Sequence, residues 1–174
     1  MQTIHSFGIS PSVYHKRGTD NDFPLITVCP QCLYPGILTK HGFYWRNAVF
    51  PGGEFRIPIR RYKCPSCHHT VSILPDFLLP NFQHGLAFVI KALRDFFIKG
   101  KRVICRQLLQ FYRRRFLKNL NRIQAFFRDL GFKGVIGEKE KAIKLLEMIH
   151  AAFPKAETFA KRFQEHFPHN FMAN

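Results

Sequence analysis

The chain has 174 residues, of which 46% are apolar and 20 are phenylalanine, so it can build a core and is not expected to be disordered. Lysine and arginine total 27 against 11 acidic residues, and the net charge of +16 favours a polyanionic partner, with nucleic acid first and an anionic membrane second. No apolar run reaches the length of a membrane span and the first residues lack a signal-peptide pattern, so we expect a cytoplasmic, nucleoid-associated protein without a membrane partner.

The first 80 residues divide into two parts. Residues 1–23 are polar and irregular and are predicted to form a flexible N-terminal arm. Residues 24–80 contain the short apolar runs that are typical of β-strands. Within them, residues 55–62 alternate apolar and basic side chains, as a half-exposed strand does, and Pro58 in this run indicates an edge position or a break. A further strand is predicted over 70–74.

Two matched cysteine pairs lie in this β region, each with the pattern Cys-Pro-x-Cys. A two-residue spacer in a tight turn allows both sulfurs to face one point, and Zn²⁺ binds four such thiolates tetrahedrally. Disulfides are disfavoured in a reducing compartment, and no βαβ unit accompanies a redox dithiol. An iron–sulfur cluster is the alternative for the same thiolates. The pattern predicts one structural Zn²⁺, bound by Cys29, Cys32, Cys64 and Cys67.

Residues 81–137 are predicted to be helical and carry most of the charge. Apolar side chains recur at helical spacing from Leu86 to Phe97 and again from Leu109 to Leu130. The second stripe is compatible with one long helix or with two helices separated by a turn near 115–119. This region has thirteen lysines and arginines against two acidic residues.

The basic side chains of this region are candidates for contact with nucleic acid. Arg114 and Asn121 have side chains suited to bidentate contact with guanine and adenine, whereas phosphate contact by all the cations is the alternative. These cations are expected to be exposed and free of internal partners. The candidate residues are Lys101, Arg102, Arg106, Arg113, Arg114, Arg115, Lys118, Asn121, Arg122 and Arg128, with Arg60 and Arg61 in the β region.

Residues 138–174 are predicted to form a C-terminal helical segment, with a helix over 138–153 that Pro154 ends and a shorter helix over 155–166. Its glutamates lie in helical patterns among lysines, which is typical of a solvated helical face and not of a catalytic carboxylate cluster.

The cysteine pairs and the residues around them resemble the N-terminal zinc ribbons of bacterial transposases and of proteins associated with mobile elements. The resemblance rests on the two Cys-Pro-x-Cys pairs, on the run 41–46 and on the run 60–75, and it covers about residues 24–80. It implies a zinc ribbon followed by helix-turn-helix DNA binding and an RNase H-like catalytic domain. Only 37 residues follow Gly137, which is too few for such a domain. We therefore expect DNA binding and no strand transfer.

The sequence thus predicts an α+β protein, in which a small β zinc ribbon at 24–80 precedes a mostly helical, helix-turn-helix-like region over 81–137. The predicted function is non-enzymatic binding of duplex DNA, as an accessory or regulatory factor of a mobile element. An RNA-binding or single-strand-binding protein that uses the ribbon and exposed aromatic residues is one alternative. An adaptor that docks a transposase or recombinase is another.

Overall fold

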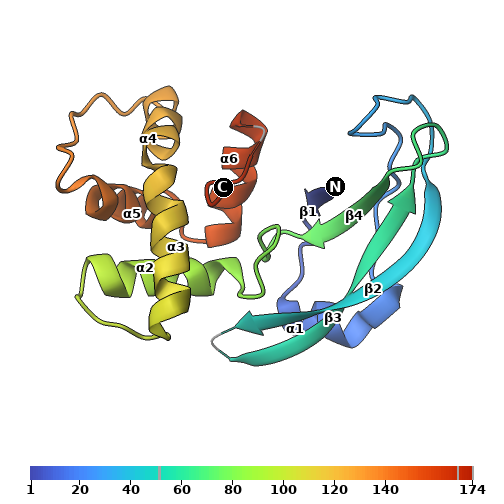
Figure 1. Ribbon diagram of the computed structural model, residues 1–174, viewed down its shortest axis with the longest axis horizontal. Coiled ribbons are helices and arrows are strands. Elements are labelled where there is room, and N and C mark those ends of the chain that lie inside the picture. Colours follow the sequence, from blue (N-terminus) through green and yellow to red (C-terminus); the bar gives the residue numbers. More distant parts are fainter. Residues whose placement is uncertain (51, 168, 174) are drawn as a thin grey trace. The chain divides into compact units, whose positions relative to one another are not determined.

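The computed structural model describes residues 1–50, 52–167 and 169–173 (Figure 1). It contains a four-stranded sheet and a set of α-helices, which confirms the α+β class. The chain divides into two compact units, Met1–Gly85 and Leu86–Asn174. The sheet belongs to the first unit, and helices α2 to α6 belong to the second.

The sheet of the first unit has the strand order β1–β4–β3–β2 (Figure 1). Strands β2 (Thr39–Phe50) and β3 (Gly53–Lys63) form a long antiparallel hairpin, with an irregularity between Lys40 and Phe43. Strand β4 (Thr70–Pro75) pairs antiparallel with the last four residues of β3 only, and β1 (Gln2–His5) pairs in parallel with β4. One edge of β3 is therefore unpaired at Pro58, which explains how a proline fits into this strand.

The segment predicted to be a flexible arm is part of the first unit, which corrects the prediction. Besides β1, it contains helix α1 (Pro11–Arg17) and a 3₁₀ turn at Gly18–Asp20. Tyr14 of α1 is fully buried against the hairpin, and its hydroxyl donates a hydrogen bond of 2.9 Å to the carbonyl of Pro58. Strand β1 has only four residues and pairs in parallel with a strand seventy positions away, so the local sequence gives almost no sign of it. The polar composition of residues 1–23 therefore wrongly indicated a flexible segment.

The first unit also extends beyond residue 80, where sequence analysis placed its end. Phe77 and Leu78 are buried in the core that Tyr14 joins. Further along, the Val49 amide donates to the Gln83 carbonyl, and the Gly85 amide donates to the Val49 carbonyl. These hydrogen bonds attach residues 83–85 to the outer edge of β2.

The second unit consists of five helices in the part of the chain that the structure describes: α2 (Leu86–Phe97), α3 (Arg106–Lys118), α4 (Leu120–Asp129), α5 (Lys141–Ala152) and α6 (Ala156–His166). Segment 138–174 is not a separate module, because Phe153, which follows α5, and two phenylalanines of α6 pack against Phe126 of α4. The Phe126 ring centroid lies 5.8 Å from that of Phe159 and 5.5 Å from that of Phe163. None of the helices among the described residues is long and apolar enough to cross a membrane.

Asn119 separates α3 from α4, which resolves the choice between one helix and two. Its side chain is buried, and its amide group donates hydrogen bonds of 2.8 Å to the carbonyls of Arg115 and Ala173. An asparagine that bonds to the backbone in this way competes with continued helix formation. It also fixes the C-terminal residues against the end of α3.

Candidate metal centre and basic surfaces

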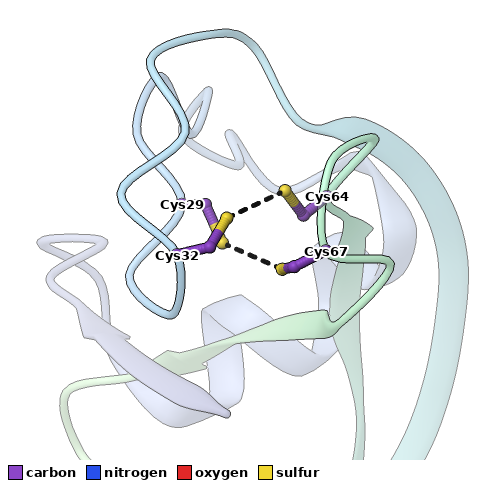
Figure 2. A group of neighbouring side chains, drawn as sticks. All are labelled: Cys29, Cys32, Cys64 and Cys67. Atoms are coloured by element: carbon purple, nitrogen blue, oxygen red, sulfur yellow. Dashed lines mark hydrogen bonds between the residues drawn. The ribbon is translucent and has the colours of Figure 1, made fainter.

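Two loops bring the four cysteines together. The first cysteine loop, residues 29–34, precedes β2, and the second cysteine loop, residues 64–69, joins β3 to β4. Figure 2 shows the sulfurs of the two loops turned toward one another. The hairpin and β4 thus position two segments that lie more than thirty residues apart in sequence.

The sulfur positions match a tetrahedral metal site. All four Sγ atoms lie within 4.8 Å of one another, and the Cys29–Cys67 and Cys32–Cys64 sulfurs are each 3.7 Å apart (Figure 2). A tetrahedron with sulfurs about 2.3 Å from its centre has edges of about 3.8 Å. A disulfide would require about 2.05 Å. The donor set and its spacing fit one Zn²⁺, and Cys29 and Cys64 are fully buried.

The pKa values of the clustered cysteines also favour a bound cation. The backbone N–H of Cys32, and less strongly that of Gln31, lower the pKa of Cys29 to about 6, although burial opposes this shift. At Cys67 the N–H of His69 lowers the pKa, but burial and the three neighbouring thiols together raise it to about 12. The opposite shifts at Cys29 and Cys67 reflect their close neighbours, since adjacent thiolates repel one another. A central Zn²⁺ removes that repulsion and allows a full set of thiolate ligands.

The two cysteine loops share a hydrogen bond and a left-handed residue at equivalent positions. In each, the residue after the second cysteine donates its N–H to the carbonyl of the first cysteine, at 2.9 Å for Leu33 and 3.0 Å for His68. Both residues have left-handed backbone angles, with φ of 59° at Leu33 and 61° at His68. A side chain in this region costs roughly 1–2 kcal/mol relative to the right-handed conformation. The loops therefore store strain at equivalent positions.

This strain leads to a stability prediction. Because the Leu33 side chain is 73% exposed, Leu33→Gly removes the strain with little loss of packing. We expect it to stabilise the first unit, within the full chain, by about 0.5–1 kcal/mol, measured by denaturant unfolding. Gln31→Gly is the control, because Gln31 lies in the same loop without a left-handed backbone, and it should destabilise slightly. Equal destabilisation by both changes would contradict the strain argument.

A small apolar cluster surrounds the cysteines. Leu38, Tyr62, Val71 and Ile73 are buried together with Cys29 and Cys64. The Tyr62 hydroxyl donates a hydrogen bond of 2.7 Å to the Pro24 carbonyl, which ties the approach to the first loop to β3. Among the described residues, no histidine joins the cysteine cluster, and His68 and His69 are both exposed. The fifth cysteine, Cys105, is exposed at the start of α3.

Most of the candidate nucleic-acid residues of the second unit are exposed. These are Lys101, Arg102, Arg106, Arg114, Lys118, Asn121, Arg122 and Arg128. Within the described ranges, Arg106, Arg114 and Lys118 of α3 have no carboxylate at salt-bridge distance. Their charges are therefore available to an external anion.

Arg113 and Arg115 are only half exposed and have internal contacts, which corrects the expectation that all these cations face solvent freely. The Arg113 guanidinium carbon lies 4.4 Å from the Phe96 ring centroid. Arg115 lies 4.5 Å from the Phe111 centroid and donates a hydrogen bond of 3.2 Å to the Met172 carbonyl. Adjacent residues of a helix point in different directions, so three consecutive arginines cannot share one exposed face.

Three further candidates also have partners within the protein. The side-chain Oδ1 of Asn121 accepts a hydrogen bond of 2.6 Å from the buried Lys141 ammonium, so this side chain is not free to read adenine in this conformation. Arg122 donates to the Asn119 side chain at 3.4 Å. In the first unit, the Arg60 guanidinium carbon lies 4.5 Å from the Phe43 centroid, and Arg61 is half-buried.

The exposed side of α3 also contains residues that sequence analysis did not select. Leu109, Tyr112 and Phe116 of this helix are buried. At 100° per residue, Gln107 and Arg114 lie almost opposite these three. We define the α3 outer face by its exposed residues, which are Arg106, Gln107, Gln110, Phe111, Arg114, Leu117 and Lys118. The helical period of the exposed glutamines was the signal that could have found them.

Part of the chain matches a known family model. Residues 29–107 match a domain of unknown function (DUF6431). The matched region includes both cysteine pairs, the β2–β3 hairpin, β4, α2 and the beginning of α3. No curated protein and no solved structure shows significant similarity to the chain.

Proposed function

We propose that this protein binds duplex DNA and that its first unit is a zinc ribbon, in which one structural Zn²⁺ is held by Cys29, Cys32, Cys64 and Cys67. The order of elements supports the ribbon: the first cysteine loop, the β2–β3 hairpin, the second cysteine loop and then β4. Four thiolates complete the metal shell and leave no position for substrate, so the metal is structural and the proposed role is not catalytic.

The α3 outer face carries the DNA-binding proposal. Arg106 and Lys118, toward the two ends of the face, are placed for phosphate contacts. Between them, Gln107, Gln110 and Arg114 offer the amide and guanidinium groups that pair with adenine and guanine in the major groove. The buried opposite side of α3 anchors the helix to the rest of the unit.

The arrangement of α2 and α3 supports a helix-turn-helix-like mode of binding. These helices contact each other, and residues 98–105 join them. In Figure 1, α3 runs across α2. In such motifs the second helix enters the groove while the first supports it. Helix α4 is a poorer candidate because only Asn119 separates it from α3 and its Asn121 is bonded to Lys141.

The resemblance to transposase zinc ribbons supports a role in a mobile element, as an accessory or regulatory DNA-binding factor. A transposase or recombinase is then a candidate protein partner. This part of the proposal rests on the residues around the cysteines and is independent of the α3 argument.

A binding panel tests the proposal. The zinc-loaded full chain is titrated against a labelled duplex, one strand of that duplex and the equivalent RNA, at two salt concentrations. We expect tight duplex binding whose logarithm falls with log salt by roughly 0.9 per phosphate contacted. Enrichment of one sequence from random duplexes would indicate base reading by α3. Failure to bind duplex at low salt, or binding of RNA alone, would refute the proposed function.

A further inference from the structure

An open depression of about 580 Å³ lies on the first unit beside the outer half of the β2–β3 hairpin. Its lining contains one aromatic side chain and four side chains that end in an amide or a guanidinium group, and no acidic residue. The lining residues are Trp45, Arg46, Asn47, Arg56 and Gln83. The depression is therefore polar, positively charged and rich in hydrogen-bond donors.

The strand pairing explains why Trp45 is presented to solvent. Side chains of β2 alternate between the two faces of the hairpin, and Ala48 faces the buried core. Trp45 and Asn47 therefore face the opposite side, where they pair with Pro58 and Arg56 of β3. Trp45 is 49% exposed, whereas its cross-strand partner Pro58 is buried. The indole is thus held on a rigid strand with part of its surface available.

Arg46 also lines the depression. Its guanidinium donates to the carbonyls of Leu79, at 3.3 Å, and of Phe82. These bonds hold the segment that precedes Gln83 along the edge of β2. Arg46 is therefore a positioning residue, while Arg56, whose guanidinium carbon lies 5.9 Å from the Trp45 ring centroid, is exposed and available for an external anion.

These groups match the parts of a nucleotide. An exposed indole stacks on a nucleobase, an arginine beside it neutralises a phosphate, and the amides of Asn47 and Gln83 can bond to a base edge. A base inside a duplex has both faces covered by its neighbours, so only an unpaired base can present a ring face to Trp45. Glu54, which pairs with Val49 near the end of the hairpin, is outside the lining.

We propose that the depression around Trp45 binds an unpaired base of single-stranded DNA, with Trp45 stacking on the base and Arg56 contacting its phosphate. The inference rests on the proposed nucleic-acid function, but it assigns the unpaired strand to the first unit and the duplex to α3.

The fluorescence of Trp45 can report binding at the depression, because Trp45 is the only tryptophan in the sequence. Full-length, zinc-loaded protein is titrated with an oligothymidylate of about ten nucleotides, a blunt duplex and an oligouridylate of the same length, while indole fluorescence is recorded. We expect saturable quenching by oligothymidylate and little quenching by the duplex. Anisotropy of labelled oligonucleotides reports binding independently of the indole.

Variants test whether oligothymidylate binds at the depression. Trp45→Ala should weaken oligothymidylate binding about tenfold, as expected for loss of one stacked base, and Trp45→Phe should retain most of the affinity. Asn47→Ala or Arg56→Ala should weaken it without removing the indole, which keeps the test valid if Trp45→Ala unfolds. Replacement of Arg106, Arg114 and Lys118 by alanine should reduce duplex binding and leave the oligothymidylate quenching intact.

Three results would overturn the inference: oligothymidylate that binds by anisotropy without quenching Trp45, equal quenching by the blunt duplex, or tighter binding of oligouridylate than of oligothymidylate at this site. Each is distinct from failure of the proposed function, which would appear as absent binding of the duplex itself.

Discussion

Replacing Cys64 by serine is expected to remove the metal and unfold the first unit. Cys64 is fully buried, and its sulfur lies 3.7 Å from that of Cys32 in the other loop. Structural Zn²⁺ contributes roughly 10–16 kcal/mol of apparent binding free energy in zinc-finger peptides, so loss of one of four ligands should cost at least about 3 kcal/mol. For a unit of this size that corresponds to a fall in melting temperature of more than about 12 °C.

The measurement combines bound zinc, determined by elemental analysis, with thermal unfolding of the full chain. Cys105→Ser is the matched control, because Cys105 is exposed and lies outside the cysteine cluster. It should retain one zinc per chain and the parent melting temperature. A Cys64→Ser protein that keeps both would show that the four sulfurs do not form the structural metal site.

Replacing Arg106, Arg114 and Lys118 together by alanine is expected to weaken duplex binding by about ten- to a hundredfold at low salt. The slope of log affinity against log salt should become shallower by up to about 0.9 for each lost phosphate contact. The fold should persist, because exposed charges contribute little to stability and alanine favours helix. Arg113 and Arg115 are left in place because their internal contacts would confuse the result.

The control removes the same amount of charge elsewhere in the second unit. Lys139, Lys144 and Lys161 are exposed and lie in or near α5 and α6. Their replacement by alanine should change duplex affinity only slightly, through the smaller net charge. If both triple variants bind alike, the attraction is a property of total charge, and the α3 outer face is not the DNA site.

The cysteine pairs, one strand and one helix could be predicted from the sequence, because the residue pattern and its physical cause lie within the same short segment. The two Cys-Pro-x-Cys pairs indicated the four residues that the structure brings together, since the turn that aims two sulfurs at one point is contained in four residues. The strand over 55–62 and the helical stripe from Leu86 were likewise visible, because each alternation is the period of one element.

The tertiary structure decided what depends on distant partners. Tyr14 and β1 belong to the first unit because of contacts with residues more than forty positions away. Asn119 ends α3 partly through the Ala173 carbonyl.

Packing also decided which charges are exposed. Arg113 and Arg114 are equivalent in a count of basic residues, yet Arg113 packs on Phe96 of α2 whereas Arg114 is exposed to solvent. Residue type and spacing thus determined which four cysteines form the candidate metal centre and the basic character of the helices. Which basic or aromatic side chains remain free to bind a partner was decided by packing, because burial is a property of the folded chain and not of the segment.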